Sequence, residues 1–386
     1  MKQASLLTFL LGFVVLLLGC SSAEEKALEP MELPDFEATA KLRKIWSRNI
    51  GSGQDVRYTL LRPVIVGDRI FATDVEGVVV ALDRQTGKKL WQVKLDLPVS
   101  GGIGAGSGIL LLGTYAAEVI ALDQQDGKIL WRTRVTSEVV SPPQTDGNLV
   151  AVQTFDGKLL GLDFNTGKQR WAYETVNPLL TLRGNASPLI FGNSVYAGFA
   201  TGKVVSVQAS DGLLLWEQRV AIPKGRGDYE RMVDIDASPL LVGDILFCVS
   251  FQGQLVAFSR ATGRPLWAQP ASSFLDLSAD GNNIYLTEDN SSIKAYRTGS
   301  GQLAWENNQL LRRKVSAPHA FASYVAVADE EDGYLHILKQ SDGSFVTRRK
   351  IDGDGVRSPM IHAGNILYVY SNDGDLVALE VVPNES

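Results

Sequence analysis

One short pattern recurs along the chain about every 42 residues, and this repeat constrains the fold more than any other feature. Its clearest copy is ALDRQTGKKLW at residues 81–91, where an apolar strand leads into a Thr-Gly turn and then a tryptophan. The turn glycine recurs at Gly87, Gly127, Gly167, Gly212, Gly263, Gly301 and Gly343. A tryptophan follows in six of these copies, and Thr347 takes its place in the last. Such periodicity is typical of solenoids and propellers.

The two ends of the chain supply the parts of one more unit. Residues 373–380, DGDLVALE, match the strand before the turn, and residues 42–46, LRKIW, match the tryptophan strand. The repeat region 42–381 has 340 residues, which is 42.5 for each of eight units (340/8). We therefore predict an all-β, eight-bladed β-propeller with four-stranded blades, in which the N-terminal strand completes the last blade and closes the ring.

The repeated residues have structural explanations. Gly-Asp and Gly-Asn hairpin turns recur between β-branched runs at 66–68, 191–193, 242–244 and 363–365. The turn glycine supplies a positive φ, and the tryptophan offers a large flat surface that can pack between blades. The glycine-rich run at 101–108 lacks the lysine and the following helix of a phosphate loop, so we interpret it as a blade hairpin. None of these residues is predicted to be catalytic.

The N-terminal segment is predicted to be a targeting signal. Residues 1–19 begin with Lys2 and contain an apolar run from Leu6 to Leu18 that is too short to span a bilayer. The sequence LLGC at 17–20 resembles the lipobox of bacterial lipoproteins, which implies lipidation of Cys20 and, because Ser21 is not aspartate, sorting to the outer membrane. Residues 20–41 are then a flexible acidic tether, and residues 382–386 a C-terminal tail.

Composition and spacing exclude several classes of function. A net charge of −6 disfavours nucleic-acid binding. The three histidines, His319, His336 and His362, fall in different repeats without ligand spacing, so no metal site is predicted. Cys248, in an apolar strand, is expected to be a buried thiol. The basic runs 312–314 and 348–350 are expected in solvated loops, with lipid or partner contact as a second possibility.

The repeat motif Ala-x-Asp-x-x-Thr-Gly-x-x-x-Trp resembles that of the pyrroloquinoline-quinone (PQQ) dehydrogenases, which are eight-bladed periplasmic enzymes. That resemblance implies a longer chain with a vicinal cysteine pair and a calcium site with a catalytic aspartate. This chain has neither long inserts nor adjacent cysteines. A PQQ-dependent quinoprotein remains an alternative, but we predict no enzymatic activity and no cofactor.

The lipobox, the acidic segment and the eight repeats together resemble the BamB family, lipoproteins of the outer-membrane β-barrel assembly machinery. Residues 179–184, LLTLRG, resemble its Leu-x-Leu-Arg-Gly loop, and residues 231–236, RMVDID, its Arg-x-x-Asp-x-Asp segment. The resemblance implies a non-enzymatic scaffold, lipid-anchored to the outer membrane and facing the periplasm. Its partners would be the POTRA domains of BamA, other subunits of the machinery and unfolded β-barrel clients. The implied contact residues are Leu180, Leu182, Arg183, Asp234 and Asp236.

These positions also have a physical rationale and a structural alternative. The segment 221–236 causes the longest repeat interval, 51 residues, so it adds a loop to a regular blade, and such loops often bind partners. Exposed Leu180 and Leu182 beside a charge would suit a protein interface. Alternatively, both leucines face the core and Arg183 bonds Asp234 or Asp236. An adaptor for another envelope complex is a further alternative.

Overall fold

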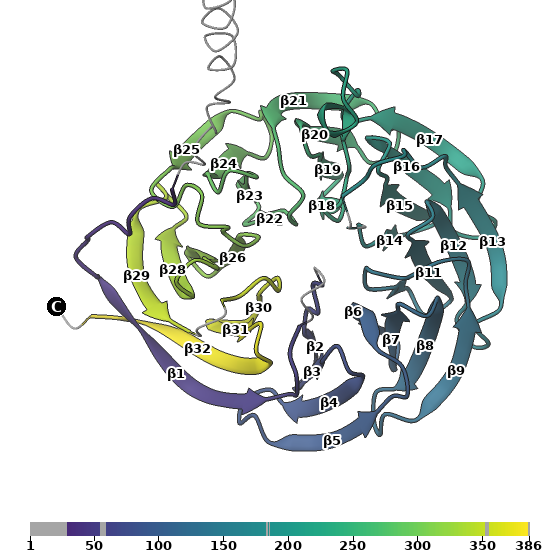
Figure 1. Cartoon of the computed structure of the whole chain (residues 1–386), viewed down its shortest axis with the longest axis horizontal. Helices are drawn as coiled ribbons and strands as arrows, with labels where there is room; N and C mark the ends of the chain where they lie inside the picture. Colours follow the sequence, from purple (N-terminus) through teal and green to yellow (C-terminus); the bar gives the residue numbers. More distant parts are fainter. Residues whose placement is uncertain (1–28, 55–58, 183, 185, 352–354, 385–386) are drawn as a thin grey trace, which may run out of the picture. The chain divides into compact units, whose positions relative to one another are not determined.

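The computed structural model describes residues 29–54, 59–182, 184, 186–351 and 355–384. Within residues 31–384, eight four-stranded antiparallel sheets follow one another around a ring (Figure 1). The prediction of an all-β, eight-bladed propeller is confirmed. The predictions of a signal peptide and of lipidation at Cys20 lie outside the described residues.

Each of blades 1 to 7 is built from four consecutive strands, numbered from the centre of the ring outward. Blade 1 contains β2 (Val64–Val66), β3 (Arg69–Thr73), β4 (Val78–Asp83) and β5 (Lys89–Lys94), and blade 2 contains β6 (Val99–Gly106), β7 (Ile109–Thr114), β8 (Glu118–Asp123) and β9 (Ile129–Arg134). Blade 3 contains β10 (Gln144–Thr145), β11 (Leu149–Thr154), β12 (Lys158–Asp163) and β13 (Gln169–Glu174), and blade 4 contains β14 (Leu189–Phe191), β15 (Ser194–Gly198), β16 (Lys203–Gln208) and β17 (Leu214–Arg219). Blade 5 contains β18 (Leu240–Val242), β19 (Ile245–Val249), β20 (Gly253–Ser259) and β21 (Pro265–Ala271), and blade 6 contains β22 (Ser278–Ala279), β23 (Asn283–Thr287), β24 (Ile293–Arg297) and β25 (Leu303–Asn307). Blade 7 contains β26 (His319–Phe321), β27 (Tyr324–Ala328), β28 (Tyr334–Lys339) and β29 (Phe345–Lys350).

Blade 8 joins the two ends of the chain. Its inner strands are β30 (Ile361–Ala363), β31 (Ile366–Tyr370) and β32 (Asp375–Pro383), and its outer strand is β1 (Ala40–Asn49). β1 pairs antiparallel with β32 from Ala40–Pro383 to Asn49–Asp375, as Figure 1 shows. The predicted ring closure by the N-terminal strand is confirmed, and β32 extends two residues beyond the predicted end of the repeat region at residue 381.

The middle strands are buried on both faces because each blade is packed between two others. β7 and β11 are buried along their whole length, whereas the outer strands β9 and β13 alternate buried and exposed residues. This difference explains the apolar runs of the repeat, since a strand covered on both sides needs no polar face. Cys248 lies fully buried in β19, as predicted, and burial raises the pKa of its thiol.

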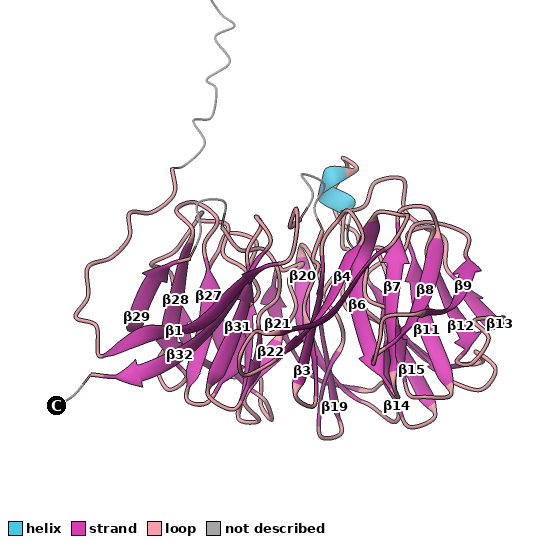
Figure 2. Cartoon of the chain, turned by 90° about the horizontal axis from the view of Figure 1, so that it is seen from below, coloured by secondary structure: helices cyan, strands magenta, loops and turns pink. Residues whose placement is uncertain are grey.

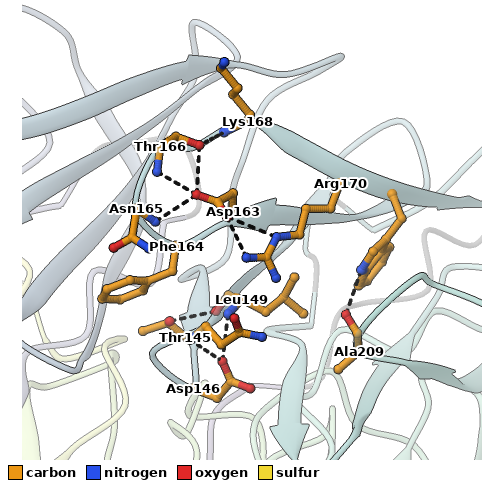
Figure 3. A network of polar contacts seen from close by, with 12 residues as sticks. Thr145, Asp146, Leu149, Asp163, Phe164, Asn165, Thr166, Lys168, Arg170 and Ala209 are labelled. Carbon is orange, nitrogen blue, oxygen red and sulfur yellow. Dashed lines mark hydrogen bonds and ion pairs between the residues drawn. The ribbon is translucent and has the colours of Figure 1, made fainter.

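The tryptophans lock each blade to the next. The indole Nε1 of Trp171 donates to the Ala209 carbonyl of blade 4 at 2.8 Å, and its ring lies against Gly212, where an added Cβ would come within 2.8 Å of it. Asp163 accepts bonds from the amides of its own turn and from Arg170 (Figure 3). All seven tryptophans make the equivalent Nε1 bond: Trp46, Trp91, Trp131, Trp171, Trp216, Trp267 and Trp305.

The junction between blades 7 and 8 is built differently. The outer strand of blade 8 belongs to β1, so no Thr-Gly turn faces Thr347 of β29, and a tryptophan there would have no docking turn. Residues 31–39, which we name the N-terminal strap, run along blade 7 instead. Phe36 stacks on Phe345 with ring centroids 5.2 Å apart, and the Thr39 amide donates to the Val346 carbonyl.

The strap corrects two sequence predictions. The prediction of a flexible tether is wrong for residues 31–41, because Met31, Pro34 and Thr39 are hydrogen-bonded to blade 7 or to the loop before it, and residues 40 and 41 lie in β1. The prediction of solvated loops is wrong for Arg313, Arg348 and Arg349. Arg313 is 3% exposed, pairs with Asp329, and donates to the Met31 carbonyl at 2.8 Å.

The other two arginines lie in β29, and each donates a hydrogen bond to a backbone carbonyl of the N-terminal segment. Arg348 donates to the Pro34 carbonyl, and Arg349 donates to the Leu42 carbonyl. Carbonyls of the strap and of β1 thus accept hydrogen bonds from arginines that the sequence analysis had placed in solvated loops.

The loops between blades and the Thr-Gly turns lie on opposite faces of the ring. The short 3₁₀ helix η1 (Tyr229–Arg231) projects from one face, shown at the top of Figure 2. The Thr-Gly turns lie at the opposite ends of the outer strands, so the tryptophan locks are away from η1. No helix in the described part of the chain is long and apolar enough to cross a membrane.

Candidate partner-binding site

Two neighbouring loops carry the residues that the sequence singled out. The first joins β13 to β14 over residues 175–188, and the second joins β17 to β18 over residues 220–239 and includes η1. Both leave the strand ends on the η1 face and flank blade 4 (Figure 2). The repeat therefore brings together segments that are 52 residues apart, as the bond between Leu182 and Asp234 shows.

Large apolar side chains in these loops face solvent. Leu179 is fully exposed, Val176 is 87% exposed and Leu180 is 43% exposed. In the second loop, Ile222 and Tyr229 are more than half exposed. Isolated apolar side chains on a surface are ordinary, but five of them on two adjoining loops make these loops the candidate binding surface.

The first loop borders a cleft of about 430 Å³. Leu179 and Leu180 form its apolar side, and basic side chains form part of its wall. The basic residues are Lys203, Arg219 and Arg231. Asp228 also lines the cleft, and Lys203 is paired with Glu217 at 2.6 Å, so the wall beside the apolar anchor carries charges of both signs.

The two aspartates hold the first loop from beneath. Asp234 is fully buried and accepts a 2.9 Å hydrogen bond from the Leu182 amide. Burial raises its pKa to about 6, although the bond from Leu182 opposes that rise. Asp236 lies against Gly184, where an added Cβ would come within 2.7 Å of its carboxyl carbon. Burial and the neighbouring Asp234 raise the pKa of Asp236 well above its ordinary value.

The second loop is fixed by its own polar contacts. The Glu230 carboxylate accepts bonds from the amides of Arg226 and Gly227, and these bonds lower its pKa. Tyr229 packs edge-on against Phe251 with ring centroids 6.3 Å apart. The exposed face of Tyr229 is thus presented from an ordered turn.

The structure brings together four of the five predicted contact residues in different roles. Leu180 is exposed, Leu182 is half-buried, and both lie on the loop that Asp234 and Asp236 support. Because Asp234 has no exposed surface, its part in the site is to shape the loop. Arg183 lies outside the described residues.

Sequence reasoning missed four exposed apolar residues of the site as contacts: Val176, Leu179, Ile222 and Tyr229. Their signal is apolar residues in segments without the period of two that marks the neighbouring strands. Among the described residues, no group of three metal-ligating side chains gathers. Two histidines, His319 and His362, nevertheless meet across the junction between blades 7 and 8.

Comparison with known proteins relates the chain to one family. A family model, Outer membrane protein assembly factor BamB, matches residues 75–307 and 289–382. The protein of that name from Pseudomonas aeruginosa is 53% identical over 380 residues, which are 98% of this chain and 99% of that protein. The crystal structure of BamB from Moraxella catarrhalis matches with a TM-score of 0.80 at 27% identity, over 88% of this chain and 100% of that one.

The quinoprotein alternative shares only the architecture. Quinohemoprotein alcohol dehydrogenase from Comamonas testosteroni matches with a TM-score of 0.70 at 13% identity, over 89% of this chain and 77% of that one, and this likeness shows the fold alone. The full-length relatives are named for assembly of outer-membrane proteins, and they confirm the prediction of a non-enzymatic factor. The chain belongs to the BamB family of outer membrane protein assembly factors.

Proposed function

We propose that this assembly factor is a lipoprotein of the outer membrane that faces the periplasm and binds the POTRA domains of BamA through the loops flanking blade 4. The observation that carries the proposal is the exposed apolar pair Leu179 and Leu180 on a loop held by the buried Asp234. A side chain presented from a fixed loop loses little conformational entropy on binding, so its burial contributes almost fully to affinity.

Each residue has a distinct part in the proposed contact. Leu180 and Leu182 are the apolar contacts, and Arg183 is the charged neighbour between them and Gly184. Asp234 and Asp236 set the path of the loop. The closed ring supplies the rigid base, so the partner domains would be oriented by a surface that does not deform when they bind.

The proposal is tested by co-purification of BamA with a Leu180→Asp variant. The substitution puts a charge into the apolar contact, and we expect BamA recovery to fall by more than about ten-fold, which corresponds to 1.4 kcal/mol. Leu180 is exposed, so the variant should melt like the unsubstituted protein.

A matched control is Leu214→Asp. Leu214 is 49% exposed, but it lies at the opposite end of β17 from Arg219, which lines the cleft. This variant should retain BamA. Equal recovery with both variants would show that BamA does not use these loops.

The docked strap also limits where the proposed anchor can hold the ring. Met31 is bonded to Leu311 and Arg313 in the loop that joins blade 6 to blade 7, and eleven peptide units separate it from Cys20. Fully extended, they reach at most about 40 Å. A lipid at Cys20 would therefore keep the blade 7 side within that distance of the membrane surface.

A further inference from the structure

His319 and His362 meet on the inner side of the ring. They lie on β26 and β30, the innermost strands of blades 7 and 8 (Figure 1). Both line a cleft of about 430 Å³ that the innermost strands of blades 5 to 8 border. Nε2 of His319 and Nδ1 of His362 are 2.8 Å apart, with the ring planes tilted by 61°.

A one-residue offset from the repeat produces this contact. The β26–β27 and β30–β31 hairpins are 42 residues apart, since Phe321 pairs with Tyr324 and Ala363 with Ile366. The histidines are 43 residues apart, so they occupy non-equivalent positions on their strands. Successive side chains of a strand point to opposite faces, and His319 therefore faces blade 8 while His362 faces blade 7.

The packing of the neighbouring strands agrees with this orientation. His319 pairs with Ala326, and His362 pairs with Leu367. Ala326 and Leu367 belong to the same apolar cluster between blades 7 and 8. The two imidazoles thus continue that inter-blade layer to its edge at this cleft.

We propose that His319 and His362 form a binding site for a divalent transition metal ion, with Cu²⁺ as the preferred ion. Two ligands at 90° with metal–nitrogen bonds of about 2.0 Å lie about 2.8 Å apart, whereas tetrahedral ligands lie about 3.3 Å apart. The observed nitrogen separation matches the right-angled arrangement of a tetragonal Cu²⁺ site. Cu²⁺ also binds nitrogen ligands more tightly than the other divalent ions of its row.

The protonation state of the pair suits a metal ligand. Burial, the nearby His362 and Arg62 lower the pKa of His319 to about 3, and burial lowers that of His362. Lowered pKa values favour the unprotonated imidazole, which is the form that binds a metal ion. In the contact, one of the two facing nitrogens carries a proton. On metal binding, that proton moves through solvent to the other nitrogen of the same ring. Both facing nitrogens then have a free lone pair for the metal, and the net charge of each ring is unchanged.

The charges around the site are nearly balanced. Arg62, which would repel a cation, lies 3.5 Å from Asp276, and both line the same cleft. No group of three ligating side chains lies here within the described chain, so the remaining coordination positions belong to water in the cleft. The site is thus of the open, exchangeable kind.

Binding would also connect blades 7 and 8. This is the junction at which Thr347 replaces the tryptophan of the other blades. An ion that binds only the folded ring stabilises it in proportion to the logarithm of its concentration. We therefore expect copper to raise the melting temperature of the protein.

The test is titration of the full-length, metal-free protein in detergent with Cu²⁺, followed by electron paramagnetic resonance. We expect one equivalent of Cu²⁺ with a tetragonal spectrum split by two imidazole nitrogens. His319→Gln and His362→Gln should each weaken binding by more than about ten-fold and abolish the copper-dependent rise in melting temperature. Each variant keeps the other histidine of the pair, so it controls for copper binding by a single imidazole.

Unchanged copper affinity in the variants would overturn the proposal. If a variant fails to fold, the spectrum of the unsubstituted protein decides alone: coupling to fewer than two imidazole nitrogens would refute the site. Zn²⁺ titrated in the same way should bind more weakly than Cu²⁺, and the reverse order would refute the right-angled geometry.

Discussion

Replacing Asp234 by asparagine should stabilise the protein at neutral pH. The carboxyl has no exposed surface, and burial raises its pKa from 3.8 to about 6. A carboxyl with a raised pKa costs the fold stability wherever it is ionised. That cost is absent at pH values below the unfolded pKa, grows as the pH rises, and is complete above the folded pKa. The shift of about 2.2 pKa units corresponds to about 3 kcal/mol at pH 7.5.

Asparagine cannot ionise, but it retains a hydrogen-bond acceptor at this position. Its side-chain oxygen can still accept the bond from the Leu182 amide, so the loop should keep its path. The expected gain is therefore the full ionisation cost of about 3 kcal/mol at pH 7.5, and it should shrink to about 0.5 kcal/mol at pH 4.

Urea unfolding at these two pH values measures the difference. Glu230→Gln is the matched control, because amide bonds lower the pKa of Glu230 and its contribution therefore has the opposite sign. That variant should lose stability at pH 7.5. A loss of stability for Asp234→Asn at pH 7.5 would refute the reasoning, since it would mean that burial of the ionised carboxylate stabilises the fold instead of costing it stability.

Two further outcomes follow from the anchor and the locks. Cys20→Ala should release the protein from membranes into the soluble fraction, and continued pelleting would contradict the lipid anchor. Trp171→Ala should lower the free energy of unfolding by about 3–5 kcal/mol, because it removes the contact with Gly212 and leaves a cavity between blades 3 and 4. Urea unfolding measures this change, and a loss below about 1 kcal/mol would show that the tryptophan is not a lock.

The repeat made the fold predictable because every copy performs the same task. A turn glycine and a tryptophan at fixed spacing imply the Trp171–Gly212 lock, and two half-units at the chain ends imply ring closure. The strap was not predictable in this way. Its acidic, proline-containing sequence has no period, and its receptors Arg313 and Arg348 are identified only when blade 7 is assembled.

The site was predictable in position but not in role. The inserted segment 221–236 and the motif at 179–184 indicated the loops, whereas the burial of Asp234 depends on how blades 4 and 5 meet. The contact of His319 with His362 was missed because spacing was compared with metal motifs within one element. The sequence signal is the separation of the two histidines, 43 residues, compared with the 42 residues between equivalent positions of the two hairpins. An offset of one residue places two side chains on the facing sides of neighbouring blades.

The arrangement of locks and loops explains how a propeller can carry a partner site without losing rigidity. Blade 4 is held by Trp171 on Gly212 at one side and by Trp216 on Gly263 at the other, both at the Thr-Gly turn ends of the outer strands. The long loops leave the opposite strand ends, so their length does not alter either lock. An insertion at 221–236 therefore adds exposed surface while the packing that positions blade 4 stays the same.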